Sequence, residues 1–245
     1  MLKTQKILDF PFINSSMINF VETVHERIIA NKKTFIVTAN PEIITYANSN
    51  SSYKQVLMDA EYIIPDGVGI IFASKFNKVP LVERLPGFEL MEELLVLANR
   101  HKYSVYFLGA QPGVIDKTVE NILKLYPNIN LAGYHHGYFR KNDTSVIDNM
   151  KQSNPDIIFL GLGFPKQENW IAENKHHFNK GVFIGLGGCF DIWGGVAKRA
   201  PKIWRNLNLE WCYRIVKEPT RIKRAIAIPK FVLKVFISKI HSKKK

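Results

Sequence analysis

The predicted fold follows from one stretch of the sequence, Ile63-Ile64-Pro65-Asp66-Gly67-Val68-Gly69. The two isoleucines end an apolar run typical of a buried strand, and the proline stops the strand's hydrogen-bonding ladder. Because ligands of open α/β sheets bind beyond the carboxyl ends of the strands, Asp66 lies where we expect catalysis. Gly67 and Gly69 allow a sharp turn and close approach of the backbone to a ligand. The alternative is that Asp66 only N-caps the following helix.

The same pattern, a buried strand followed by glycine, proline or polar residues, recurs along the chain. It is found at residues 34–39, 104–108, 156–160 and 181–186, with a shorter strand predicted at 129–132. Helical stretches alternate with the strands, at residues 42–47, 53–58, 68–76, 88–99 and 114–126. This alternation predicts an α/β fold with a doubly wound, mostly parallel, Rossmann-like sheet.

The composition indicates a protein with a substantial core in a reducing compartment. The chain has 245 residues, of which 46% are hydrophobic. Its two cysteines, Cys189 and Cys212, make neither a disulfide framework nor a metal-ligand cluster. The sequence has no apolar run of about 18 residues that would span a membrane, and residues 1–5 lack the apolar core of a signal peptide. We therefore expect a cytoplasmic protein.

The net charge of +13 lies at one end of the chain. Residues 198–245 carry fifteen Lys and Arg against two Glu, whereas residues 1–197 carry 19 basic and 19 acidic side chains. We therefore predict a neutral Rossmann-like core, residues 1–197, and a basic helical C-terminal appendage, residues 198–245. A basic appendage on a neutral body indicates a polyanionic partner, either nucleic acid or an anionic membrane surface.

The appendage has two segments of different character. In a helix, Arg214, Lys217, Arg221 and Arg224 share one face, although Pro219 must kink or break that helix. Beyond this segment, an apolar stripe lies opposite several lysines, a pattern typical of a helix in a membrane interface. The stripe consists of Val232, Leu233, Phe236, Ile237 and Ile240. The alternative is a helix docked on the body; for the last segment we favour the membrane.

Polar side chains near other strand ends are candidates for ligand binding. Thr38 and Asn40 lie beside a helix N-terminus that can bind an anion, although a plain cap explains Asn40 equally well. Arg84 lies in a loop between prolines, where it either pairs with Glu83 or presents its guanidinium group to a phosphate. Gln167 lies in the first turn of a helix and can reach a ligand.

Two further candidates have a structural alternative. Tyr138 either stacks on a base or packs after a strand. Asp191 is surrounded by four glycines, which indicate backbone packed tightly against a ligand or a neighbouring helix. The adjacent histidines at 135 and 136 lack further ligands at metal-binding spacing, so we predict no zinc site.

Five motifs resemble, in the same order, those of the WecG/TagA/CpsF glycosyltransferases. They are Thr38-Ala39-Asn40-Pro41-Glu42, Pro65-Asp66-Gly67-Val68-Gly69, Glu83-Arg84-Leu85-Pro86-Gly87, Gly161-Leu162-Gly163-Phe164-Pro165-Lys166-Gln167-Glu168 and Ala200-Pro201. The resemblance implies a peripheral, inverting, metal-independent transferase on the cytoplasmic face of the membrane. It is strongest to the branch of wall teichoic acid synthesis, which moves N-acetylmannosamine from UDP-ManNAc to undecaprenyl-diphosphate-GlcNAc in a β-1,4 linkage.

The candidate residues suit the chemistry that this resemblance implies. Inverting transfer needs a base for the acceptor hydroxyl, and Asp66 is the candidate. Many sugar transferases neutralise the leaving diphosphate with a metal held by Asp-x-Asp, a motif that this sequence lacks. We therefore expect no cofactor and assign that charge to Arg84, with Arg214, Arg221 and Arg224 as alternatives. Thr38, Asn40 and Gln167 would orient the sugar hydroxyls or acetamido group, and Tyr138 and Asp191 would hold uridine.

Two other functions stay open from the sequence. A related transferase would use another UDP-sugar such as N-acetylmannosaminuronic acid, because the sugar epimer is recognised by fine geometry. A non-catalytic nucleic-acid-binding module would also have a basic appendage, but the body is neutral and the last segment lacks aromatics interleaved for stacking. We therefore expect no nucleic acid partner. The sequence is also compatible with a homo-oligomer.

Overall fold

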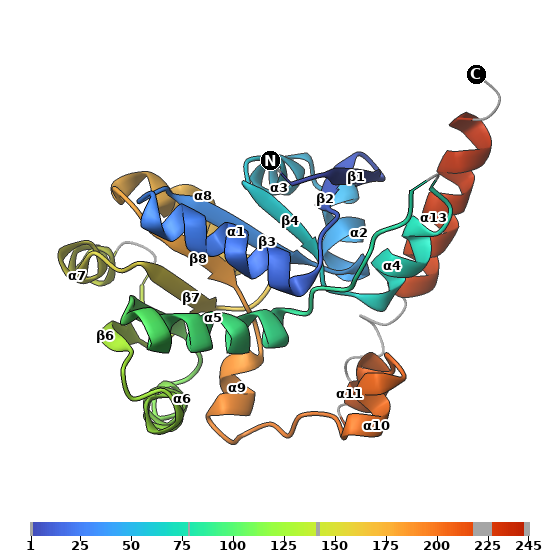
Figure 1. The fold of residues 1–245 in the computed structure, drawn as a ribbon. Helices are drawn as coiled ribbons and strands as arrows, with labels where there is room; N and C mark the ends of the chain where they lie inside the picture. The colour runs from blue at the N-terminus through green and yellow to red at the C-terminus, as the bar shows by residue number, and fades with distance from the viewer. Residues whose placement is uncertain (1, 78, 141–142, 218–226, 243–245) are drawn as a thin grey trace.

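A computed structural model of the chain describes residues 2–77, 79–140, 143–217 and 227–242 (Figure 1). One sheet of eight strands lies at its centre, in the order β1-β2-β4-β3-β8-β7-β5-β6. Neighbouring strands run parallel, except for the antiparallel pair β1 and β2. The strands are β1 (Thr4–Ile7), β2 (Phe10–Ile13), β3 (Thr34–Ala39), β4 (Tyr62–Pro65), β5 (Ser104–Gly109), β6 (Asn130–His135), β7 (Ile157–Gly161) and β8 (Val182–Gly185). The predicted mostly parallel α/β sheet is confirmed.

Helices cover both faces of the sheet and form two apolar layers. One face carries α1 (Met17–Ile29), α5 (Gly87–His101), α6 (Val114–Leu125) and α9 (Cys189–Trp193). The other carries α2 (Pro41–Ser49), α3 (Ser51–Met58), α4 (Val68–Ser74), α7 (Ser145–Ser153), α8 (Lys166–Asn174) and α13 (Ala227–Ser242), and a short 3₁₀ turn, η1 (Lys175–His177), follows α8. Along β3, Phe35 and Val37 belong to one layer and Ile36 to the other, as the alternation of side chains in a strand requires.

The N-terminal hairpin and the helix after it were not predicted. The strands β1 and β2 have four residues each; β1 includes polar Thr4, Gln5 and Lys6, and a proline interrupts the short apolar β2. β2 joins the sheet by pairing in parallel with β4. The helix α1 does carry a readable signal, because Phe20, Val24 and Ile28 are buried at intervals of four residues.

The glycines after β4 serve packing between helices. A Cβ atom on Gly67 or Gly69 would lie 2.6 Å from the Pro41 ring, so both glycines let α4 approach the start of α2. Gly67 itself has a φ of −89°, which any residue adopts. The bend at Gly67 therefore needs no φ that only glycine adopts, and the neighbour that the backbone approaches is Pro41.

The last helix of the appendage docks on the body. The appendage forms α10 (Lys202–Asn206), α11 (Glu210–Lys217) and α13. In α13, Phe231 and Val235 are 1% and 3% exposed and pack into the layer that contains α2 and α4. Of the predicted stripe, Val232 packs partly on this layer, whereas Leu233, Phe236 and Ile237 are exposed; the side chain of Ile240 lies outside the described set. The helix therefore has one docked apolar face and one exposed apolar face.

None of the helices that the structure describes combines the length and the apolar content needed to cross a bilayer.

Arg199 fixes the start of the appendage to α5. Its guanidinium group forms ion pairs with Glu89 and Glu92 and lies 4.0 Å from the centre of the Phe88 ring. The Phe88 ring stacks in turn on Trp193 at the end of α9. Glu89 and Phe88 belong to the first turn of α5, so the appendage begins beside the carboxyl edge of the sheet.

Candidate active site

A cavity of about 980 Å³ lies at the carboxyl edge of the sheet. Segments that follow all six central parallel strands line it, together with α11 and the first turn of α13. This is the edge at which the functional residues were predicted from the sequence. The cavity brings together Thr38, Asn40, Asp66, Arg84, Tyr138, Gln167 and Asp191.

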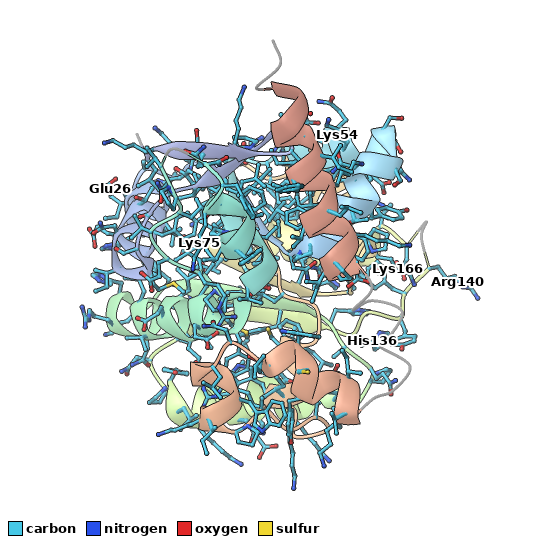
Figure 2. All side chains as sticks on the ribbon, turned by 90° about the vertical axis from the view of Figure 1, so that its right-hand side faces the viewer. Glu26, Lys54, Lys75, His136, Arg140 and Lys166 are labelled. Atoms are coloured by element: carbon cyan, nitrogen blue, oxygen red, sulfur yellow. The ribbon has the colours of Figure 1, made fainter. Side chains whose placement is uncertain are left out.

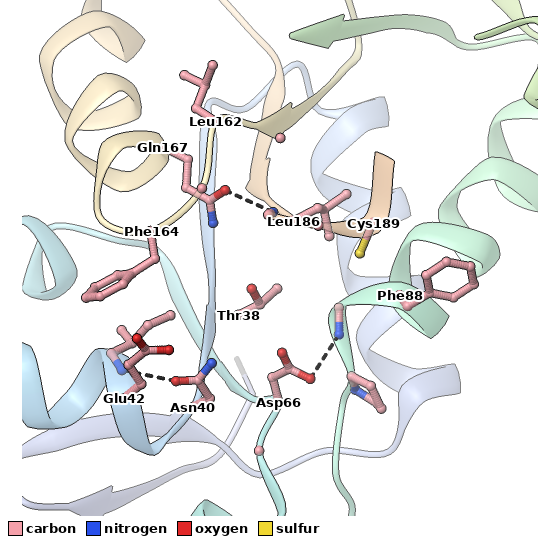
Figure 3. Close-up of a pocket in the computed structure, with 18 of the residues that line it drawn as sticks. Thr38, Asn40, Glu42, Asp66, Phe88, Leu162, Phe164, Gln167, Leu186 and Cys189 are labelled. Atoms are coloured by element: carbon pink, nitrogen blue, oxygen red, sulfur yellow. Dashed lines mark hydrogen bonds between the residues drawn. The ribbon is translucent and has the colours of Figure 1, made fainter. Parts of the chain in front are cut away.

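Asp66 follows β4, and hydrogen bonds fix both its backbone and its side chain. Its N–H donates to the Ala39 carbonyl at the end of β3 (3.0 Å). Its Oδ1 accepts from the N–H of Gly87, the first residue of α5, at 3.2 Å (Figure 3). The N-cap of α4 is Gly67 without a side-chain hydrogen bond, so the expectation that Asp66 caps the next helix is wrong. It caps α5 instead, whose N-terminus favours the charged carboxylate.

Arg84 lies close to Asp66 in the loop before α5. Its Nη1 donates to the Asp66 backbone carbonyl at 3.4 Å. Glu83 accepts a hydrogen bond from the Met17 N–H (3.1 Å), and in the described residues it forms no ion pair with Arg84. The structure therefore does not support pairing of Arg84 with Glu83. The Arg84 side chain instead lines the cavity, where it is available to a ligand.

Thr38 and Asn40 stand on the carboxyl end of β3. The Thr38 hydroxyl donates to the Gly185 carbonyl of β8 at 2.8 Å, which leaves its oxygen lone pairs as acceptors toward the cavity. Asn40 is the N-cap of α2, since its Oδ1 accepts from the Ile43 N–H at 3.0 Å. The capping role of Asn40 is thus confirmed, and its amide group also lines the cavity.

Gln167 is buried at the start of α8, with 3% of its surface exposed. Its Oε1 accepts from the Gly187 N–H at 2.9 Å (Figure 3). Its Nε2 donates to Glu168 Oε1 at 2.8 Å. The amide group therefore holds the glycine turn after β8 at the edge of the cavity. Its predicted contact with a sugar stays a prediction.

Tyr138 and Asp191 line the cavity from β6 and α9. Tyr138 is 66% exposed, so its ring is available to a ligand. Of the four glycines around Asp191, Gly194 packs against α6, because a Cβ atom on it would lie 2.8 Å from Val114 Cγ1. Gly187 and Gly195 have open space around them and positive φ angles of 52° and 75°, so the neighbouring helix explains the tight backbone at Gly194 alone.

The side chains of the three arginines predicted from the appendage, Arg214, Arg221 and Arg224, are not among those that the structure describes. Arg214 belongs to α11, whose residues Trp211 and Ile215 line the cavity, but its own side chain is not among those described. Arg221 and Arg224 lie outside the described residues.

The lining of the cavity carries more carboxylates than cations. Among the described lining residues, the cations are Arg84 and Lys166. The carboxylates are Glu42, Asp66, Glu89, Glu173, Asp191 and Glu210. Glu89 is paired with Arg199, and Arg84 and Lys166 are the described lining cations that can meet the charge of an anionic ligand.

Several residues in or directly behind the lining of the cavity were not predicted from the sequence: Lys166, Trp211 and Ile215 line it, whereas Glu168 is buried beside Gln167. Lys166 and Glu168 lie in a motif that was identified, but only Gln167 received a role. Glu168 is 1% exposed, and burial raises its pKa to about 7. A charged residue in the first turn of a helix is ordinarily exposed, so nothing local signals this burial. Trp211 and Ile215 are separated from the other lining residues in sequence.

No three His, Cys, Asp or Glu side chains converge as a metal-binding group within the part of the chain that the structure describes.

These features define a doubly wound α/β protein with a ligand cavity at its carboxyl edge and a carboxylate fixed beside an arginine. The profile of the Glycosyl transferase WecG/TagA/CpsF family matches residues 5–245. The chain therefore belongs to the WecG/TagA/CpsF family and is a glycosyltransferase.

Relatives of known activity resemble the chain over nearly its whole length. It is 42% identical over 241 residues to the N-acetylglucosaminyldiphosphoundecaprenol N-acetyl-beta-D-mannosaminyltransferase of Staphylococcus aureus strain MW2, covering 97% of this chain and 94% of the relative. The protein of the same name from strain MRSA252 is 41% identical over the same length.

Proposed function

We propose that the protein is an inverting transferase that moves N-acetylmannosamine from UDP-ManNAc to undecaprenyl-diphosphate-GlcNAc. The product would be the β-1,4-linked disaccharide lipid of wall teichoic acid linkage-unit synthesis. The names of the relatives support the acceptor and the sugar. The observation that carries the reaction type is the Asp66 carboxylate, fixed on the N-terminus of α5 and facing a cavity of about 980 Å³. That volume suits a nucleotide sugar and the head of an acceptor.

In the proposed mechanism, Asp66 removes the proton of the acceptor hydroxyl as the oxygen attacks the anomeric carbon. The Gly87 N–H holds Oδ1 in place, and the ionised carboxylate is the form that a base needs. Thr38 and Asn40 flank the same edge and would orient the sugar. UDP leaves with the negative charge, and Tyr138 and Asp191 would hold its uridine.

The negative charge that develops on the leaving diphosphate has to be met by fixed cations. Arg84 lies 3.4 Å from the Asp66 carbonyl through its Nη1 and is the first candidate. Arg214, Arg221 and Arg224 of the basic appendage would supply further cations.

Transfer is expected to persist in excess EDTA, because arginine side chains take the place of a metal on the diphosphate. The measurement is UDP release with and without chelator, using purified protein. A manganese-dependent transferase treated in parallel shows that the chelator is effective. Abolition of transfer by EDTA, with recovery on adding Mn²⁺ or Mg²⁺, would contradict a metal-independent mechanism.

A panel of donors tests the proposed substrate. Purified protein would be incubated with a lipid-diphosphate-GlcNAc analogue and UDP-ManNAc, UDP-GlcNAc or UDP-N-acetylmannosaminuronic acid. We expect product from UDP-ManNAc, and the six lining carboxylates disfavour the uronic acid because it adds a negative charge. Faster transfer from the uronic acid would overturn the donor assignment.

The proposed acceptor lies in a membrane, and one face of the molecule suits contact with it. Figure 2 shows α4 and α13 side by side on the face turned to the viewer. The rings of Phe76 and Phe236 are 6.2 Å apart, and those of Phe72 and Phe76 are 5.6 Å apart. We call the exposed side chains of Phe72, Phe76, Leu233, Phe236 and Ile237 the α4–α13 surface. Lys75, Lys230 and Lys234 are exposed beside it and would attract anionic lipid.

Replacing both Phe76 and Phe236 by Ser is expected to weaken binding to phosphatidylglycerol vesicles by ~30-fold. Each ring is about half exposed, so its insertion contributes about 1 kcal/mol, and two rings contribute about 2 kcal/mol. Vesicle co-sedimentation measures the effect. Ile29→Ser with Leu125→Ser is a matched control, because both residues are exposed apolar side chains on other helices.

Equal vesicle binding by the double Phe variant and the control would contradict the membrane role of this surface. Tighter binding to RNA than to vesicles at the same salt concentration would favour the nucleic-acid alternative instead.

A further inference from the structure

Glu168 is a buried carboxylate that the proposed mechanism does not use. It lies in the first turn of α8 and is 1% exposed. Its Oε1 accepts from Gln167 Nε2 at 2.8 Å, and Gln167 Oε1 accepts from the Gly187 N–H at 2.9 Å. A chain of hydrogen bonds thus connects the buried carboxylate to the glycine turn at the edge of the cavity.

This chain fixes which way the Gln167 amide points. An ionised carboxylate only accepts hydrogen bonds, and a backbone N–H only donates. Both partners are satisfied only when Nε2 faces Glu168 and Oε1 faces Gly187. When Glu168 Oε1 is protonated, its O–H donates a hydrogen bond, and Gln167 no longer has to face it with Nε2. The Gln167 amide can then turn so that its oxygen faces Glu168. In that orientation Nε2–H points at the Gly187 N–H, and the hydrogen bond to the turn is lost.

The glycine turn that Gln167 holds is part of the candidate active site. A Cβ atom on Gly185 would lie 2.5 Å from Gln167 Nε2, so the amide packs directly on the end of β8. The Gly185 carbonyl accepts from the Thr38 hydroxyl, and Leu186, Gly187 and Gly188 line the cavity. The orientation of the amide therefore determines the position of one wall of the site.

We propose that Glu168 is a positioning residue, which in its ionised form orients Gln167 and thereby holds the Gly185–Gly188 turn in the geometry that binds the substrates. The proposal rests on the proposed function for its effect on turnover, but the hydrogen-bond chain itself does not.

The surroundings of Glu168 place its ionisation near neutral pH. Burial raises its pKa to about 7, and the hydrogen bond from Gln167 opposes this shift. The titratable group that faces it is Tyr53 of α3, whose own pKa is raised by burial and then by the charge of Glu168. Tyr46 and Glu42 of α2 act on Tyr53 from further away, and β8 presents glycine. Glu168 is thus charged above about pH 7 and neutral below it.

The first test is the pH profile of turnover for the wild type and for Glu168→Gln. We expect an acidic limb near pH 7 in the wild type that is absent from the variant. At pH 8 the variant should be slower by roughly 10-fold, because Gln167 then donates to a neutral amide oxygen, which is a weaker acceptor than a carboxylate and no longer fixes the orientation of the amide. Glu26→Gln, at an exposed position on α1, is the control and should leave the profile unchanged. Superimposable profiles of wild type and Glu168→Gln would overturn the proposal.

The second test needs no substrate, so it separates this proposal from the proposed function. In the wild type, the NMR signals of the Gln167 side-chain amide and the Gly187 N–H should shift together with a midpoint near pH 7. The same signals should not titrate in Glu168→Gln. If they titrate in neither protein, the proposal fails even if sugar transfer occurs; if they titrate only in the wild type and no transfer occurs, the proposed function fails alone.

The pH dependence of thermal stability is an independent test of the ionisation of Glu168. Because the folded state raises the pKa of Glu168, it binds more protons than the unfolded state between the two pKa values, and stability falls as pH rises toward 7. Glu168→Gln lacks this loss, so its Tm relative to wild type should be higher at pH 8 than at pH 5.5. An equal difference at both pH values would contradict the ionised buried carboxylate.

Discussion

Asp66→Asn is expected to lower turnover by roughly 10²–10⁴-fold, the usual contribution of a general base. An amide cannot take the proton of the acceptor hydroxyl, whereas its Oδ1 can still accept from the Gly87 N–H that the carboxylate now holds. The fold, the start of α5 and UDP binding should therefore survive. The measurement combines steady-state kinetics with calorimetric titration of UDP.

Asp148→Asn is the matched control, because Asp148 is an exposed aspartate in the first turn of α7. It should behave as the wild type in both assays. Activity of Asp66→Asn within a few-fold of wild type would contradict the assignment of Asp66 as the general base. Asp66 would then have only a structural role at the start of α5.

Alanine at Arg214, Arg221 or Arg224 is expected to lower turnover by roughly 10²-fold, even with a soluble short-chain acceptor. The reason is electrostatic, since six carboxylates and two cations are found among the described residues that line the cavity. A diphosphate in such a cavity requires cations from elsewhere in the chain.

Deleting the residues beyond 198 should abolish both turnover and membrane binding, and should also expose the layer that Phe231 and Val235 now cover.

Lys230→Ala with Lys234→Ala is the control for the arginine variants. These exposed lysines of α13 should affect vesicle binding but not turnover of the soluble acceptor. If the arginine variants show this same behaviour, the arginines only anchor the protein and have no part in the active site.

The fold was predictable because β3, β4, β5, β7 and β8 are nearly continuous buried runs, whereas the edge strand β6 is exposed or half-buried. Thr34–Ala39 was predicted with the bounds that the structure has, and the segments after β3, β4, β7 and β8 meet at one edge as strand polarity requires. The hairpin of β1 and β2 could not be predicted in this way. Its two short strands, of which β1 is partly polar, are stabilised by pairing with each other and by the pairing of β2 with β4, which a local pattern does not show.

The candidate site was predictable where a residue lies at the end of a strand, as Thr38 does, or directly follows one, as Asn40 and Asp66 do. What each one contacts depended on elements distant in sequence. The Asp66 carboxylate caps a helix that begins 21 residues later, and the two glycines beside it make room for Pro41. Likewise, α13 carries two apolar faces, and only the structure shows that Phe231 and Val235 form the docked one.

Single displacement with Asp66 as base is tested most directly by the anomeric configuration of the product. The disaccharide lipid formed from UDP-ManNAc would be isolated and its new linkage assigned by NMR. Direct attack of the acceptor oxygen predicts inversion and hence a β-linked N-acetylmannosamine. A product with retained configuration would contradict the mechanism, because retention requires a second displacement for which Asp66 as base provides no role.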